Sequence, residues 1–326
     1  MSERTRDSRE INFIDYFKTG SLKVILDYIV ANPDLNLCFR GNATDKEGRV
    51  ITIYKNNHRL LNIIKMLKAK YSYKLEFNYK HVTEEEKDDY KHKLGARWSL
   101  KQSKDNERME CELTDNDDRD FICKSLDCLV EILDKYFLIK GNSLLEKKRQ
   151  HELFAAFSDV SNAEEDYFIY DLEFYPPKNF YENLPSNQAD FLAVNYNAGC
   201  VNKIVFGEVK SKEGALSGKS GLLSHLEKML KWKDNIVFVN NRKRELKVLL
   251  EHYAKLGLSK NVEDINFLDV DKCDVEILVI LTDDAIDKYD KASGEGKDTY
   301  RNIVDKEYSD KGVVVKKFVN GKLEDI

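Results

Sequence analysis

Three residues whose types could act together on a phosphodiester lie in two neighbouring apolar runs. Asp190 opens the first run, which continues through residues 191–194; Glu208 lies near the end of the second run, residues 204–209, and Lys210 follows it. Turn-forming residues at 195–202 separate the two runs, as in a β-hairpin. We therefore expect antiparallel pairing to bring Asp190 and Glu208 together, although they are 18 positions apart.

Side chains of a strand repeat every second residue, so Glu208 and Lys210 share a face while Val209 turns into the core. Two carboxylates bind a hard divalent cation such as Mg²⁺, or Mn²⁺ in its place. A lysine beside them can orient a water molecule or stabilise transition-state charge. The pattern predicts phosphodiester hydrolysis, with Asp190 and Glu208 as metal ligands and Lys210 positioning the attacking water.

A plainer interpretation of the same residues stays open. Asp190 can be a cap at a strand end, and Glu208 with Lys210 an ordinary ion pair across one face. An acid-x-Lys triplet is common in any charged protein. Here Glu208 follows a strongly apolar strand, where a solvated charge is not expected, and this favours the metal site.

These residues resemble the Asp…(Asp/Glu)-x-Lys signature of the PD-(D/E)XK nuclease superfamily. The resemblance covers about residues 141–240, and Ala189 stands where the family often has a proline that is not a ligand. It implies a restriction-endonuclease-like three-layer α/β domain with a mixed central sheet. It also implies a metal-dependent nuclease that cuts DNA or RNA with Mg²⁺ or Mn²⁺, in a bacterium and in defence against foreign nucleic acid.

Carboxylates on two further elements are candidates for the same site. A helix is expected over residues 144–157, with Glu146 and Gln150 four apart on one face. The resemblance implies an acidic residue on this helix, for which Glu146 is the candidate and Glu152 the rival; Glu146 is equally an ordinary exposed helix residue. A strand over 167–175 presents Asp171 and Glu173 on one face, where they either enlarge the metal site or pair with nearby lysines.

The glycine-rich segment 214–221 precedes a helix expected over 222–232, and residues 218–221 with His225 resemble a bacterial branch of the same superfamily. Free amides at a helix N-terminus bind anions, so Lys219 and Ser220 are candidate phosphate contacts. His225, on the first turn of the helix, is a third candidate. The glycine spacing is not that of a nucleotide P-loop, which disfavours ATP. Alternatively the glycines only permit a tight turn, and the histidine is structural.

Chain length and net charge limit the number of domains and the kinds of partner to expect. A chain of 326 residues suggests two domains, which we place at residues 1–140 and 141–326, with the joint at 141–143. The net charge of −5 gives no general basic footprint, yet residues 203–247 carry eleven Lys or Arg against five Asp or Glu. Such a basic rim fits a polyanionic substrate, and it fits a solvated helix face nearly as well.

The first domain shows no catalytic constellation. Its patterning predicts an α/β fold with a mostly antiparallel sheet: a helix or helix pair over 12–30, strands over 35–40, 50–54 and 73–79, and a strand or helical turn over 60–66. A helix starts at 82–86, where Thr83 and Glu86 have capping-box spacing, and another covers 121–137. In the second domain we expect a helix over 245–256, a buried strand over 275–281 and an edge strand over 313–318.

Six scattered cysteines without a Cys-x-x-Cys pair indicate reduced thiols and no zinc site. The charged first residues lack a signal-peptide core, and no run of about 18 apolar residues could span a membrane. We expect a cytoplasmic protein with a nucleic acid substrate and no membrane partner; a homo-oligomer stays open.

The alternative function is a non-catalytic module with the nuclease fold that binds nucleic acid or a protein partner. A purely structural interaction protein is a third interpretation.

Overall fold

The structure is a computed structural model that describes residues 14–40, 50–66, 72–103, 106–114, 116–160, 165–176, 181, 184–218, 221–266, 270–291 and 298–326. The backbone divides into two compact units. The first comprises Met1–Leu144 with Lys255–Leu258, and the second Leu145–Ala254 with Ser259–Ile326. The joint expected at residues 141–143 lies just before this division. Lys219 and Ser220 lie outside the described residues.

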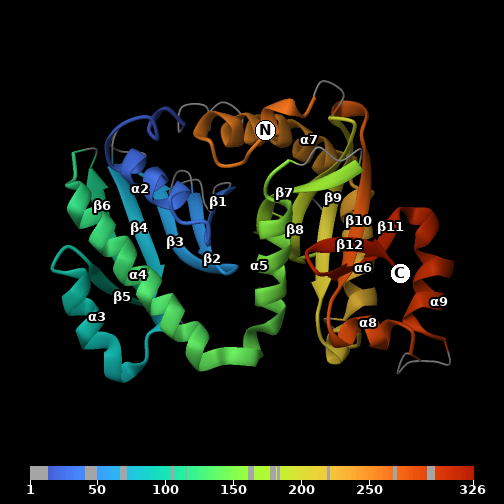
Figure 1. Ribbon diagram of the computed structural model, residues 1–326, viewed down its shortest axis with the longest axis horizontal. Helices are drawn as coiled ribbons and strands as arrows, with labels where there is room; N and C mark the ends of the chain where they lie inside the picture. The colour runs from blue at the N-terminus through green and yellow to red at the C-terminus, as the bar shows by residue number, and fades with distance from the viewer. Residues whose placement is uncertain are drawn as a thin grey trace. The chain divides into compact units, whose positions relative to one another are not determined.

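The first unit is built on an antiparallel sheet in the order β1-β2-β3-β4-β6-β5 (Figure 1). Its strands are β1 (Leu35–Arg40), β2 (Val50–Lys55), β3 (His58–Lys65), β4 (Ser72–Asn78), β5 (Ser99–Ser103) and β6 (Asn106–Thr114). Its helices are α2 (Gly20–Val30), α3 (Lys87–Leu94) and α4 (Arg119–Lys140), with short 3₁₀ turns η1 (Tyr79–His81), η2 (Glu84–Glu86) and η3 (Gly141–Leu144). The predicted antiparallel sheet is therefore present.

Helix α4 covers one face of this sheet. Its apolar stripe buries Ile122, Leu126, Leu129 and Leu133, at the three- and four-residue spacing of a helix face. Asp118 caps its start by accepting a hydrogen bond from the Asp120 N–H. Helix α2 packs beside α4, and the two helices are joined by the hydrogen bond from Tyr28 to Asp127.

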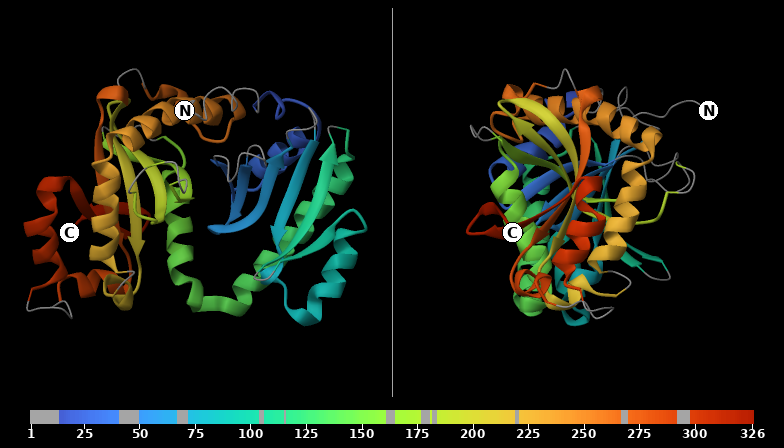
Figure 2. Two further views of the ribbon diagram at one scale, coloured as in Figure 1. Left: turned by 180° about the vertical axis from the view of Figure 1, so that it is seen from behind. Right: turned by 90° about the vertical axis from the view of Figure 1, so that its right-hand side faces the viewer.

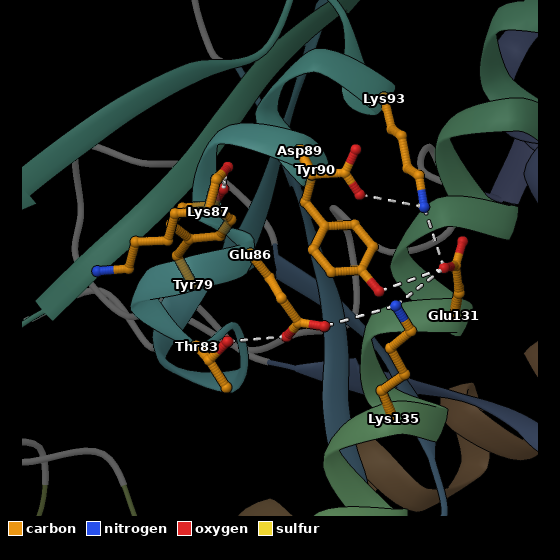
Figure 3. Close-up of polar contacts among 9 residues, drawn as sticks. All are labelled: Tyr79, Thr83, Glu86, Lys87, Asp89, Tyr90, Lys93, Glu131 and Lys135. Carbon is orange, nitrogen blue, oxygen red and sulfur yellow. Dashed lines mark hydrogen bonds and ion pairs between the residues drawn. The ribbon is translucent and has the colours of Figure 1, made fainter.

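A polar network joins α3 to α4 (Figure 3). Glu131 on α4 accepts from Lys93 at 3.1 Å and from the Tyr90 hydroxyl at 3.3 Å, and it lies 3.5 Å from the Lys135 ammonium. Lys135 also reaches Glu86 at 3.5 Å. The ion pairs are largely exposed, so each contributes little to stability by itself.

The capping box predicted for residues 83–86 is wrong. The Thr83 hydroxyl donates to the Glu86 carboxylate at 3.0 Å, and neither side chain caps a backbone amide of the turn. The α-helix begins later, at Lys87, after the 3₁₀ turn η2. Glu86 is drawn instead toward Lys135, because an ion pair competes for its carboxylate (Figure 3).

The second unit holds a mixed sheet in the order β12-β11-β10-β9-β8-β7. Its strands are β7 (Glu165–Phe174), β8 (Ala189–Asn197), β9 (Cys200–Lys210), β10 (Asp274–Leu281), β11 (Val313–Val319) and β12 (Lys322–Asp325). Strands β7, β8 and β9 pair antiparallel, β9, β10 and β11 pair parallel, and β12 is antiparallel to β11. Seven of the eight β10 residues are buried, as expected for a strand covered on both faces.

The helices of this unit are α5 (Leu145–Phe157), α6 (Leu222–Lys233), α7 (Ile236–Leu256), α8 (Asp284–Tyr289) and α9 (Tyr300–Glu307). Short 3₁₀ turns are η4 (Glu213–Leu216), η5 (Val262–Asp264), η6 (Val270–Lys272) and η7 (Ser309–Lys311). Helix α5 lies on one side of the sheet and α6 on the other (Figures 1 and 2). Trp232 of α6 packs edge-on against Phe206 of β9 and Phe174 of β7, and this contact fixes α6 to the sheet.

Several element predictions are corrected by the structure. The β5–β6 hairpin was not predicted, because its strands are rich in charged and polar residues; of the two alternatives left open for residues 60–66, the strand is confirmed as β3 (His58–Lys65). The strand expected at the edge, 313–318, is an inner strand, since β12 pairs outside it. Helix α7 begins at Ile236 and not at 245, and α8 and α9 were missed.

All six cysteines are free in the structure. Among the described residues, every helix is too short or too polar to cross a bilayer.

Candidate metal centre

The β8–β9 hairpin places Asp190 and Glu208 side by side. Pairing starts at Asn197 with Cys200, next to a turn at Ala198 and Gly199 with positive φ, and runs down to Phe191 opposite Gly207. The next residues on the two strands are Asp190 and Glu208. The strand register alone therefore brings the two carboxylates to one end of the hairpin.

A glycine is required at the last paired position. A Cβ atom on Gly207 would lie 2.0 Å from Cζ of Phe191, so the phenyl ring lies directly over the Gly207 α-carbon. Both residues are in the core, with Phe191 only 2 % exposed. Because the ring leaves no space for a side chain, this contact fixes where the strands separate before Asp190 and Glu208.

Glu208 is almost completely buried, at 2 % exposure. Its Oε1 lies 2.6 Å from the Lys210 ammonium. Nδ1 of His225 lies 2.7 Å from the same oxygen, although its direction does not satisfy hydrogen-bond geometry. Oε2, in contrast, is buried and has no hydrogen-bond partner among the described residues. A buried carboxylate oxygen of this kind is costly unless it has a ligand.

The Asp190 carboxylate accepts a hydrogen bond from the Val209 N–H at 2.8 Å. Burial raises the pKa of Asp190 well above its ordinary value, and the charge of Glu208 raises that pKa further, while the bond from Val209 opposes both effects. Two carboxylates that share a site without a cation disfavour each other's charge. The pair is thus arranged to gain from a bound cation.

Lys210 is 5 % exposed and extends along the same face as Glu208. Burial by itself lowers the pKa of Lys210, but the charge and hydrogen bond of Glu208, with smaller contributions from Asp190 and Glu146, raise the pKa on balance. The side chain is therefore a charged hydrogen-bond donor at neutral pH and not a general base.

Helix α5 brings Glu146 to the site and keeps Glu152 away from it. The charge of Glu146 raises the pKa of both Asp190 and Lys210, so its half-buried carboxylate lies within electrostatic reach of the pair. Glu152 instead accepts a 2.5 Å hydrogen bond from Arg149. One turn after Glu146, Gln150 is 3 % exposed, and neither atom of its amide has a partner among the described residues.

Asp171 and Glu173, the two candidate acids on β7, differ in burial and in their partners. A bulge between Ile169 and Asp171 interrupts the pairing of β7 with β8, and Glu173 has a φ of +49°. The Asp171 side chain is buried and accepts from the Leu172 N–H, whereas Glu173 forms a 2.5 Å ion pair with Lys147. Glu173 thus pairs with a nearby lysine, which is one of the two alternatives left open for these acids.

His225 is the described member of the predicted phosphate-binding group, and it faces Glu208. It lies on the first turn of α6, whose N-cap residue is Gly221. The structure therefore places this histidine at the acidic pair. The two other predicted members, Lys219 and Ser220, fall in the part of the loop that the structure does not describe.

Much of the predicted basic rim is neutralised by neighbours. Lys203 pairs with Glu276 at 2.6 Å, Arg242 with Glu245 at 2.6 Å and Lys247 with Asp271 at 3.1 Å. These pairs belong to the packing of β9, β10 and α7. The local charge excess counted along the sequence is therefore weaker in three dimensions than it is in the chain.

The donor set fits a hard divalent cation. No group of three or more His, Cys, Asp and Glu side chains with metal-binding spacing occurs in the described part of the chain. The carboxylates present are Asp190, Glu208 with its unpartnered Oε2, and Glu146 within electrostatic reach. Mg²⁺ is commonly held by only one or two protein carboxylates and keeps water in its remaining positions.

Comparisons with protein-family models, with curated proteins and with solved structures give no significant match to this chain.

Proposed function

We propose that the chain is a metal-dependent nuclease that hydrolyses DNA or RNA phosphodiesters. The observation that carries the proposal is the buried, unpartnered Glu208 Oε2 beside Asp190 and Lys210 at the open end of the β8–β9 hairpin. A purely structural ion pair would satisfy both carboxylate oxygens or leave the spare one in water. This carboxylate is withheld from water, and one of its oxygens has no partner among the residues that the structure describes.

The assigned roles follow from charge and burial. Asp190 and Glu208 would hold Mg²⁺ or Mn²⁺, with Glu146 completing the acidic set. The bound cation supplies the positive charge that stabilises charge developing on the phosphate. Lys210 keeps its proton and donates a hydrogen bond, so it orients a water molecule for attack on phosphorus. His225, at Glu208, limits the directions in which that carboxylate can turn.

The architecture supports the same proposal. A mixed sheet with helices on both sides carries the acidic residues, as the likeness to the PD-(D/E)XK superfamily implies, and we propose a restriction-endonuclease-like fold for residues 141–326. A nucleic acid substrate, a cytoplasmic location and a role in bacterial defence belong to the proposal on the same basis.

One observation favours a second candidate, a non-catalytic module that binds nucleic acid or a protein. The Lys210 ammonium lies 2.6 Å from Glu208 and neutralises the carboxylate that would hold the cation. In this alternative the buried ion pair is structural, and no cation enters.

A metal titration and a cleavage panel separate the two. Isothermal titration with Mn²⁺ should give heat that is lost in Asp190→Ala and kept in Asp166→Ala, a control on the neighbouring strand β7. Single- and double-stranded DNA and RNA should then be incubated with Mg²⁺ or Mn²⁺. Heat without cleavage of any substrate would leave a cation-binding module, and no heat at all would remove the metal site.

A further inference from the structure

Arg149 on α5 and Asp283 after β10 form a bidentate ion pair between parts of the chain 134 residues apart. Nε of Arg149 donates to Oδ2 at 2.7 Å, and Nη2 donates to Oδ1 at 2.6 Å. Both side chains are mostly buried, at 29 % and 22 % exposure. Two parallel charge-assisted bonds fix the distance and also the orientation between the two elements.

Asp283 adopts a backbone conformation that serves this pair. Its φ is +51°, in a region that residues with a Cβ rarely occupy. It stands at the N-cap position of α8, where an aspartate usually bonds a backbone amide, yet it makes no cap bond. The carboxylate is committed to Arg149 instead, and this bond lowers the pKa of Asp283.

Glu152 holds the other side of the guanidinium. Nη1 of Arg149 donates to the Glu152 carboxylate at 2.5 Å. The Arg149 guanidinium is therefore bound both by Glu152 of its own helix and by Asp283 after β10, which restricts the rotation of its side chain. The role of Glu152 is to orient Arg149.

The pair connects directly to the acidic site. The Thr282 N–H, next to Asp283, donates to the Lys210 carbonyl at 2.9 Å. On the other element, Arg149 is three residues after Glu146, so both lie within one turn at the start of α5. That turn and α8 lie at the same end of the sheet (Figures 1 and 2).

We infer that Arg149 and Asp283 are positioning residues that clamp the first turn of α5 to the Lys210 strand end and thereby hold Glu146 at the acidic pair. The inference rests on the proposed nuclease function. The clamp touches neither cation nor substrate; its effect passes through Glu146. Without it, α5 keeps its buried face on the sheet, while its first turn gains freedom to move away from Asp190.

The test measures cleavage by Arg149→Ala, Arg149→Lys and Asp283→Asn. We expect kcat to fall by about 10- to 100-fold in Arg149→Ala, since small misplacements of active-site groups have effects of that size. Arg149→Lys keeps the charge without the parallel bonds and should fall by nearly as much. Arg301→Ala is the matched control, because Arg301 forms a similar two-bond pair with Asp290 away from the site.

A double-mutant cycle with Glu146→Gln separates positioning from general damage. In the Glu146→Gln background, Arg149→Ala should lower kcat by less than threefold, because the residue it positions is already changed. An equal loss in both backgrounds, or an unchanged kcat in Arg149→Ala, overturns the inference.

Hydrogen exchange supplies a readout that needs no activity. Amides of the first turn of α5 should exchange at least tenfold faster in Arg149→Lys than in the parent, with those of α6 unchanged. Equal exchange overturns the inference even in a protein that cleaves. If the parent protein cleaves no substrate, both the proposed function and this inference fail. If the parent cleaves but the Arg149 variants behave like it, only this inference fails.

Discussion

The carboxylate of Asp190 accepts a hydrogen bond from the Val209 N–H across the strand pair, with an Oδ2–N distance of 2.8 Å. Regular pairing of β8 with β9 ends at Phe191 and Gly207, so a side chain takes over where the backbone ladder stops. This bond turns Asp190 toward Glu208. It also satisfies one carboxylate oxygen of this partly buried acid.

Replacing Asp190 by Asn should stabilise the protein while abolishing cleavage. The folded-state pKa of Asp190 is raised, so its charged form is disfavoured in the fold, and at neutral pH the group destabilises the native state. The amide oxygen of Asn can still accept from Val209. We therefore expect a higher Tm in Asp190→Asn than in the parent.

Thermal unfolding without added metal checks this expectation. Asp274→Asn, at an exposed position at the start of β10, is the control and should leave Tm within about 1 °C of the parent. A lower Tm in Asp190→Asn would contradict the conclusion that the charged form of Asp190 destabilises the native state.

Lys210→Ala should abolish cleavage and leave metal affinity nearly unchanged. An ammonium does not ligate a cation, and its removal frees the Glu208 oxygen that it occupies. We expect a loss of at least about 10²-fold in kcat, the size of effect seen when a transition-state donor is removed. Cleavage kinetics together with Mn²⁺ titration measure both quantities.

The matched control for Lys210 is Lys203→Ala on the same strand. Lys203 forms a 2.6 Å pair with the equally buried Glu276 and should leave kcat within about threefold. Loss of metal affinity in Lys210→Ala as large as in Glu208→Ala would argue against the assigned role.

Gly207→Ala should destabilise the protein by about 1–3 kcal/mol, the usual range for overpacking a core. The added Cβ would lie 2.0 Å from the Phe191 ring, which must shift and carry Asp190 with it. Urea denaturation gives the loss, and cleavage should fall with it. The double variant Gly207→Ala with Phe191→Leu removes the clash and should recover part of the stability; no recovery would show that the ring is not the obstacle.

The stability of the first unit should fall with acidification through His81. Burial lowers the pKa of His81 to about 3, with smaller contributions from Lys80 and His58. A lowered folded-state pKa means that the unfolded chain binds a proton first. The stabilising contribution is complete above the ordinary pKa of about 6.5 and is lost as pH falls from there toward 3, by about 1.4 kcal/mol per pH unit.

His81→Phe should remove this slope, since a phenyl ring keeps the edge contact with Tyr136, whose ring centroid is 4.6 Å away. Urea unfolding at pH 4, 5, 6 and 7 measures the slope. His92→Gln, on the exposed face of α3, should leave it unchanged. If the unfolding free energy of the parent and of His81→Phe falls equally with decreasing pH, groups other than His81 cause the acid sensitivity.

The sequence by itself determined the elements whose pattern is strong and local. The apolar runs on either side of the turn at 195–202 specify a hairpin, and the period of two gives Glu208 and Lys210 a common face. The sequence likewise predicts the helix that buries Ile122, Leu126 and Leu133, because apolar residues spaced three and four apart indicate an amphipathic α-helix. Strands β5 and β6 were not readable, since their charged side chains lie on the exposed face of an antiparallel sheet.

Only the tertiary structure showed which acid on α5 lies within electrostatic reach of Asp190. Glu146 and Glu152 are equivalent by composition and differ in what lies opposite them. Asp283, 131 residues after Glu152, engages Arg149, and Arg149 in turn binds Glu152. The bulge just before Asp171, and the phenyl ring that requires glycine at 207, are likewise set by strands that pair across the sheet. Such contacts depend on groups far apart in the chain, and local periodicity carries no record of them.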